Sequence, residues 1–210
     1  MSFSKLASSL ALLTIFLLFK FKPTLGVHPL FHICSSNHQN FTANDPYETN
    51  LKELTLYLSH ETATKGFSVG SKGHGQHQVY GVALCRGDVL DIECSTCVVT
   101  ASKEIRNLCP YNKGATIWYD HCLYKYQSDD IFGQIDHKNM VLMCNNQNLD
   151  GSNKLHGLTQ CTRDISSSDC EFCLEFAITK LSHDCDGKHG GRFLGGSCNV
   201  RYELYKFFNT

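Results

Sequence analysis

An excess of charge of either sign is missing from this sequence. Its 210 residues carry 19 Lys and Arg against 20 Asp and Glu, a formal net charge of −1. The N-terminal segment 1–26 holds Lys5, Lys20 and Lys22 and no acidic residue, so the remainder carries 16 Lys and Arg against 20 Asp and Glu, a net charge of −4. Binding to nucleic acid or to an anionic membrane surface relies on a surplus of Lys and Arg. The composition therefore argues against both as partners.

A long hydrophobic run is present at the N-terminus, and the rest of the chain lacks a second one. Residues 6–19 are almost entirely apolar, follow the basic Lys5, and precede small residues at Thr24 and Gly26. At about 14 residues, this run is shorter than the roughly 20 that span a bilayer. It therefore predicts a cleaved signal peptide over residues 1–26, and a secreted, extracellular protein without a membrane anchor.

Residue sets typical of an enzyme are also missing. We find no paired general acid and base, no nucleophile elbow and no glycine-rich phosphate loop. The 11 histidines are scattered, and His74 and His77 lie in a glycine-rich loop without carboxylate neighbours in the sequence. We expect no catalysis, no metal and no cofactor. The motif Asn40-Phe41-Thr42 predicts N-glycosylation at Asn40 in a secreted chain.

Cysteine, in contrast, is abundant, and its spacing reveals a repeat. Two sets of five cysteines have identical gaps of 8, 2, 11 and 12 and are offset by a constant 76. The sets are Cys85, Cys94, Cys97, Cys109, Cys122 and Cys161, Cys170, Cys173, Cys185, Cys198. Four matching gaps in a row indicate a tandem duplication.

The second half of the duplication is shorter at one place. Each half has a leading cysteine, but the gap from Cys34 to Cys85 is 50 and that from Cys144 to Cys161 only 16, a difference of 34. In the first half, Asp45-Pro46 predicts a helix start. Apolar residues then follow at helical spacing: Tyr47, Leu51, Leu54, Leu58. We predict that this helix runs to about His60 and has no counterpart in the second half.

Periodicity and turn residues predict the remaining elements. In the first half they are strands 79–85, 115–119 and 122–127 and a helix from 91 that Pro110 ends; in the second, a strand 155–161, a helix 169–184, and strands 191–194 and 198–207. The fold class is α+β, with two tandem disulfide-rich modules of helices on an antiparallel sheet. We place the modules at 27–127 and 138–210, with a linker at 128–137.

The motifs Cys94-x-x-Cys97 and Cys170-x-x-Cys173 leave three interpretations open. A thioredoxin-like redox pair occupies such a position at a helix start, and a zinc site pairs two such motifs. Export and two even sets of six cysteines favour structural disulfides instead. Six cysteines allow 15 connectivities, and the residues alone do not choose among them.

The duplicated run Cys-x8-Cys-x2-Cys-x11-Cys-x12-Cys resembles the plant cysteine-rich repeat secretory proteins, whose module is the ginkbilobin-homologous or stress-antifungal domain. The sequence Cys144-Asn145-Asn146-Gln147-Asn148 is similar to the usual opening of that module. The resemblance implies two helices on a five-stranded antiparallel sheet. It also implies six disulfides: Cys34–Cys109, Cys85–Cys94, Cys97–Cys122, Cys144–Cys185, Cys161–Cys170 and Cys173–Cys198.

The resemblance further implies a carbohydrate site. Ginkbilobin-type members bind mannose through an Asn, an Arg and a Glu, and the matching positions of the second half are Asn145, Arg192 and Glu203. Together these groups can satisfy neighbouring sugar hydroxyls. The first half has none of them: Ser35, Thr116, Gln127. A structural alternative is a cross-strand ion pair between Arg192 and Glu203.

These observations predict a secreted, non-enzymatic recognition or defence protein of the plant apoplast. Its partners would be mannose-containing glycans or, alternatively, cell-wall or receptor ectodomain proteins without sugar binding; a third hypothesis is a degenerate structural duplicate. The missing helix also leaves apolar surface open, which normally finds a partner. We therefore predict that the second half packs against the first half or against another chain.

Overall fold

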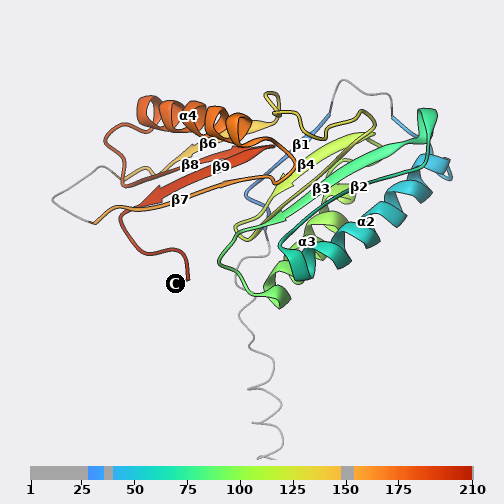
Figure 1. Cartoon of the computed structure of the whole chain (residues 1–210), viewed down its shortest axis with the longest axis horizontal. Helices are drawn as coiled ribbons and strands as arrows, with labels where there is room; N and C mark the ends of the chain where they lie inside the picture. Colours follow the sequence, from blue (N-terminus) through green and yellow to red (C-terminus); the bar gives the residue numbers. More distant parts are fainter. Residues whose placement is uncertain (1–27, 36–39, 148–153, 210) are drawn as a thin grey trace, which may run out of the picture.

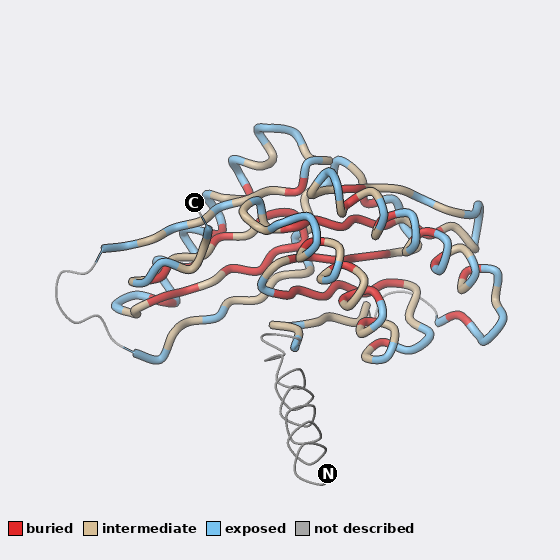
Figure 2. The backbone as a smooth tube through the Cα atoms, turned by 90° about the horizontal axis from the view of Figure 1, so that it is seen from below, coloured by how far each residue is buried: buried red, intermediate tan, exposed pale blue. Residues whose placement is uncertain are grey.

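The computed structural model of the protein describes residues 28–35, 40–147 and 154–209. The predicted signal peptide lies outside these residues. The described chain forms two modules, each with one antiparallel sheet and helices on one of its faces (Figure 1). Buried residues follow the central strands of both sheets, and exposed residues gather in the loops and on the outer sides of the helices (Figure 2).

The first module is a five-stranded sheet covered by two helices. Its strand order is β1-β4-β5-β3-β2. The strands are β1 (Phe31–Cys34), β2 (Phe67–Lys72), β3 (Val79–Cys85), β4 (Gly114–Trp118) and β5 (Cys122–Gln127); the helices are α2 (Pro46–Lys65) and α3 (Asp91–Leu108), with a 3-10 turn η1 (Gly75–His77) between β2 and β3. The residue patterns predicted β3, β4, β5 and both helices but neither β1 nor β2.

Helix α2 begins where its sequence indicates and ends later than predicted. The Asp45 side chain accepts a hydrogen bond of 2.8 Å from the Tyr47 N–H, which caps the helix. The helix continues past His60 to Lys65 because Thr62 extends the buried stripe by one turn. Thr62 is fully buried, and its hydroxyl donates to the Leu58 carbonyl at 2.6 Å.

The second module has a four-stranded sheet of order β6-β8-β9-β7. Its elements are β6 (Met140–Cys144), β7 (His156–Cys161), α4 (Ser167–Asp184), β8 (Gly190–Gly195) and β9 (Cys198–Glu203). Within its described residues α4 is the only helix, as the shortened sequence predicts. The last strand ends at Glu203 rather than Phe207, and β6 was not predicted.

The twelve cysteines form six disulfides, which join the same positions in the two modules. The pairs are Cys34–Cys109, Cys85–Cys94, Cys97–Cys122, Cys144–Cys185, Cys161–Cys170 and Cys173–Cys198. In the first module, Cys85–Cys94 joins the end of β3 to α3, and Cys97–Cys122 joins α3 to β5. These bonds hold the helix on the sheet.

The modules dock through the sheet faces that carry no helix, so α4 lies on the opposite side of the molecule from α2 and α3 (Figure 1). Trp118, Leu123 and Leu194 form a buried apolar cluster between them. The Trp118 Nε1–H donates to the Gly195 carbonyl at 3.1 Å. The buried Lys125 Nζ donates to the Gly196 carbonyl at 2.7 Å. The second half thus packs against the first as predicted, but through the helix-free face of its sheet and not through the surface that the missing helix leaves open, where Leu155 and Ile178 stay exposed.

This interface repeats itself with the internal duplication. Lys125 of the first module contacts the Gly196 turn of the second. Arg201, which occupies the position of Lys125 in the second repeat, contacts Asp120, which occupies the position of Gly196 in the first. Such reciprocal contacts are those of an isologous, two-fold interface. The linker is held as well, because the Asp136 N–H donates to the Ser197 hydroxyl at 2.9 Å.

Candidate binding site at the module interface

The three predicted sugar-binding residues lie on neighbouring strands. Asn145 directly follows β6, Arg192 lies on β8, and Glu203 ends β9. The Asn145 N–H donates to the Gly190 carbonyl at 2.9 Å, and Gly190 pairs in register with Glu203. Asn145 and Glu203 are therefore two strand spacings apart, roughly 10 Å. Tertiary structure thus brings residues far apart in the sequence to one end of the second sheet.

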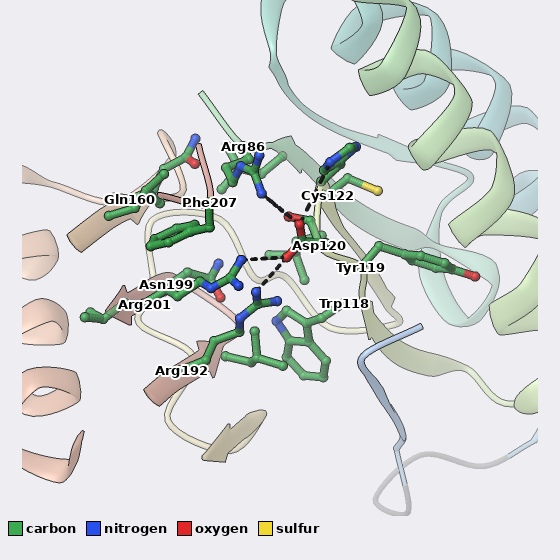
Figure 3. Close-up of a pocket in the computed structure, with 16 residues that line it drawn as sticks. Arg86, Trp118, Tyr119, Asp120, Cys122, Gln160, Arg192, Asn199, Arg201 and Phe207 are labelled. Atoms are coloured by element: carbon green, nitrogen blue, oxygen red, sulfur yellow. Dashed lines mark hydrogen bonds and ion pairs between the residues drawn. The ribbon is translucent and has the colours of Figure 1, made fainter. Parts of the chain in front are cut away.

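Arg192 is engaged across the module interface. Its guanidinium donates to Asp120 Oδ1 at 2.6 Å, and Arg201 donates to the same oxygen at 3.1 Å. Arg86 donates to the other carboxylate oxygen of Asp120 at 2.9 Å. Figure 3 shows the three guanidinium groups converging on this one carboxylate. Asp120 therefore links an arginine of the first module with two arginines of the second.

Neighbouring charges and burial have opposite effects on the pKa of Asp120 in this cluster. Burial by itself would raise the pKa of Asp120, but the guanidinium groups of Arg192, Arg201 and Arg86 hold it below its usual value. Burial and the like charge of Arg201 lower the pKa of Arg192, and Asp120 opposes this effect. Arg86 also pairs with Asp88 and Arg201 with Glu203, so Asp120 matters most for Arg192 and joins the three arginines at the interface.

Glu203 has one satisfied and one unsatisfied oxygen. Oε1 accepts a hydrogen bond of 3.0 Å from Arg201 Nε. Oε2 is buried, and no group in the described part of the chain donates to it. It lies against Gly190, where an added Cβ would come within 2.0 Å of it. The ion pair between Arg192 and Glu203, the structural alternative to sugar binding, does not form; Arg192 pairs with Asp120 and Glu203 with Arg201.

Asn145 forms a turn as well as being a candidate ligand. Its Oδ1 accepts a hydrogen bond of 3.1 Å from the Gln147 N–H, and the residue remains half-buried. Its amide nitrogen is the group with which it could donate to a sugar hydroxyl.

A small cavity lies beside the Asp120 cluster. Its volume is about 60 Å³, and its lining includes Arg86, Trp118 and Arg192. This is room for a few water molecules rather than for a hexose ring. Phe207 covers it from the C-terminal tail, with the Arg201 guanidinium 4.0 Å from the centre of the Phe207 ring. A sugar would therefore have to bind at the open end of the sheet, near Asn145.

Sequence reasoning missed Asp120 and Arg86. Neither belongs to a motif, and the counterpart of Asp120 in the repeat is Gly196. The contacts that make Asp120 important come from the other module, 72 and 81 residues away in the sequence. A pattern within one module has no signal for them.

The cysteines do not offer ligands for a metal ion, because they are paired in disulfides. Among the described residues, one group of His, Cys or acidic side chains has the spacing of metal ligands: His32, Cys34 and Cys109. Cys34 and Cys109 are joined in a disulfide, so neither offers a thiolate. The described helices include none long and apolar enough to cross a membrane.

Comparison with known proteins assigns the fold and the spacing to a family. Residues 33–129 and 133–205 match the salt stress response/antifungal family. The chain belongs to this family. An antimicrobial ginkbilobin-2-like protein of Castanea crenata is 47% identical over 217 positions, which cover 87% of this chain and 90% of the relative. Cysteine-rich repeat secretory protein 38 of Arabidopsis thaliana is 40% identical, with 86% of each chain covered.

Solved structures agree with this assignment. The tandem DUF26 ectodomain of the Arabidopsis thaliana cysteine-rich receptor-like protein PDLP5 superposes with a TM-score of 0.74 at 26% identity, covering 84% of this chain and 99% of that one. The corresponding ectodomain of PDLP8 has a TM-score of 0.78 at 22% identity, covering 85% and 98%. The likeness to PDLP8 shows the shared fold.

Proposed function

We propose that this chain is a secreted, non-enzymatic recognition protein that acts in plant defence in the apoplast. The observation that carries this proposal is the similarity over most of the chain to a protein named as antimicrobial and to proteins named as secretory. The six disulfides support it, because such bonds persist in an oxidising, extracellular compartment. The docked modules form a body that presents binding surfaces at fixed positions.

We further propose a weak mannose site at the end of the second sheet, formed by Asn145, Arg192 and Glu203. Support comes from their neighbouring strands and from the Glu203 Oε2, a buried acceptor to which no described group donates. A sugar hydroxyl is a donor that would satisfy it. The Arg192 guanidinium has several N–H groups, so it can retain Asp120 and still donate to a ligand.

Isothermal titration calorimetry with mannose and with a mannan tests this site. Asn145→Ala is the sharpest variant, because Arg192→Ala would also remove an interface contact. We expect Asn145→Ala to abolish binding and Ser35→Ala, its counterpart in the first module, to leave it unchanged. If the unchanged protein shows no heat of binding with either ligand, the mannose site is refuted, while the recognition role still stands.

Recognition of another protein without sugar is the second candidate function. It is favoured by the similarity to the PDLP5 ectodomain and to an Arabidopsis thaliana cysteine-rich receptor-like protein kinase, which is 34% identical over 96% of this chain but only 36% of the kinase. Binding of purified receptor ectodomains that persists in Asn145→Ala would support this function.

A further inference from the structure

We propose that the second module has a docking groove for an amphipathic α-helix of another protein, on the side of its sheet that carries α4. The groove has a volume of about 450 Å³, and its lining includes Leu155, Gly157, Ile178, Leu181 and Tyr202. It lies on the sheet face that carries α4. Arg201 contributes to its lining, but the guanidinium groups of Arg192 and Arg201 bind Asp120 across the module interface. The proposal therefore goes beyond the mannose site.

The internal repeat shows that this surface is built to be covered. Residues Val79, Ser102 and Tyr126 of the first module are 0%, 3% and 1% exposed, and α2 packs over this face. Their counterparts in the second repeat are Leu155, Ile178 and Tyr202. Leu155 is 61% exposed and Ile178 is 47% exposed. The positions of Leu155 and Ile178 are thus buried in the first module and open in the second, while Tyr202 is half-buried.

Leu155 and Ile178 carry large apolar side chains at these open positions, although the exposed Thr159 takes the place of the buried Ala83. A surface that faces water permanently tends to carry polar residues, and large contiguous apolar patches usually mark an interaction site. At one position the polarity is reversed: the buried residue of the first module is the polar Ser102, and its exposed counterpart in the second is the apolar Ile178. A β-branched aliphatic side chain at this place is explained by a partner that buries it.

Helix α2 indicates what kind of partner fits. In the first module Leu54 and Leu58 rest directly on Gly81, where an added Cβ would lie 3.0 Å from Leu54 Cδ2 and 2.8 Å from Leu58 Cδ1. The counterpart of Gly81 is Gly157, whose added Cβ would meet only the Arg201 carbonyl, at 3.9 Å. The sheet surface at Gly157 could therefore accept two leucines at i and i+4, as the surface at Gly81 does, and no described side chain occupies it.

In the described part of the chain, no helix fills this groove. The alignment with the Castanea crenata relative spans 217 positions, although only 87% of this 210-residue chain takes part in it. The alignment positions at which this chain has no residue are therefore about as many as the 34 residues that the second half lacks between Cys144 and Cys161. The 16 residues between Cys144 and Cys161 are too few for a helix of the length of α2, which has 20 residues.

A second copy of the chain is also a poor source. The apolar stripes of α2 and α3 are already buried in their own modules, so a copy would have to unfold to offer one. Outside the groove, α4 exposes only the pair Phe172 and Phe176, rather than a stripe of four large residues like that of α2. The partner is thus a protein with an amphipathic helix that carries large apolar residues at i, i+4, i+7 and i+11, the spacing of Tyr47, Leu51, Leu54 and Leu58.

A peptide of residues 45–66, the sequence of α2, is a direct probe. We expect the labelled peptide to bind the folded protein in fluorescence polarisation with a Kd of about 10–100 µM. Leu155→Asp and Ile178→Asp should each weaken binding at least about tenfold, since each places a charge in the groove. Both residues are exposed, so these variants should fold with unchanged thermal stability.

Two controls distinguish binding in the groove from nonspecific hydrophobic binding. Phe172→Asp changes another exposed apolar residue of α4, 56% exposed and outside the groove, and should leave binding unchanged. A peptide with Leu54→Asp and Leu58→Asp should not bind. The proposal is overturned by absence of saturable binding up to about 1 mM, or by binding that Leu155→Asp and Ile178→Asp leave intact. Self-association abolished by Ile178→Asp, without peptide binding, would assign the groove to a second copy and overturn it equally.

Discussion

At the scale of single residues, Asp120 is the carboxylate on which three arginines converge. It lies in a turn between β4 and β5 and receives hydrogen bonds from Arg86, Arg192 and Arg201. Its side chain is 44% exposed, so solvent screens these ion pairs more than those of a buried group. The cluster is nevertheless directional, because two of its arginines come from the opposite module.

Replacing Asp120 tests that role. We expect Asp120→Asn to lower the free energy of unfolding by about 1–2 kcal/mol, less than the loss for a fully buried pair because of the partial exposure. Arg192 would then lose its ion-pair partner, while Arg86 keeps Asp88 and Arg201 keeps Glu203. Chemical denaturation at neutral pH measures the loss, and Glu171→Gln, an exposed carboxylate on α4, is the matched control.

The same substitution has a pH signature. The pKa of Asp120 is lower in the folded than in the unfolded protein, so its stabilisation is complete above the unfolded value of about 3.9 and is lost as the pH falls through the lower folded value. The stability difference between the unchanged protein and Asp120→Asn should therefore be constant above about pH 5 and shrink below about pH 4. A difference independent of pH would show that Asp120 acts through packing alone.

At the scale of elements, the two modules are the same construction with and without one helix. The strand β3 and its counterpart β7 have glycines at the same place, Gly81 and Gly157. In the first module this glycine allows α2 to approach the sheet closely. In the second, the same glycine faces the open groove.

This difference predicts opposite results for one substitution. We expect Gly81→Ala to destabilise the protein by about 1–3 kcal/mol, because its Cβ would press on Leu54, Leu58 and the Lys125 carbonyl. Gly157→Ala should change stability by no more than about 0.5 kcal/mol, because its Cβ would meet no close neighbour. Thermal unfolding of the two variants side by side measures both, and an equal loss at the two positions would contradict the open groove.

At the scale of the whole molecule, the two modules behave as one body because they share an interface core and a docked linker. Tyr80 of β3 and Phe132 of the linker stack edge to face at 5.4 Å, and Ile131 is buried. Lys125 in the interface has a pKa lowered by burial, which Asp136 of the linker opposes. Separation of the modules would expose Trp118 and the apolar residues around it.

We therefore expect a single cooperative unfolding transition and resistance of the linker to proteolysis. Limited digestion should leave the peptide bonds around Asp129 and Asp130 intact under conditions that cleave a flexible peptide of the same sequence. Rapid release of a stable first module would show that the interface does not persist in solution.

The disulfide set gives a second prediction for the whole chain. Alkylation without reduction should label no cysteine, since all twelve are paired. Closed loops of these lengths stabilise by about 2–4 kcal/mol each, so reduction should lower the melting temperature strongly. Intact mass of the secreted protein also reports the residue at which it begins and whether Asn40, which is exposed, carries a glycan.

The sequence by itself determined the duplication, the missing helix and most of the elements. These features are local or periodic: cysteine gaps repeat at fixed distances, and α2, α3 and α4 each bury one stripe at helical spacing. Strands β1, β2 and β6 escaped, because β1 and β6 are short edge strands and β2 has Gly70 and Ser71 in place of a strong β pattern. Their place comes from pairing with partners distant in the sequence.

Only the tertiary structure decided how the candidate site is used. The sequence named Asn145, Arg192 and Glu203 as neighbours, but it contained nothing about Asp120, which takes Arg192 across the module interface. It showed that a helix was missing, but not that Leu155 and Ile178 remain exposed around Gly157. Burial and ion pairing depend on which surfaces meet in space, and that depends on the docking of two modules rather than on the pattern within either one.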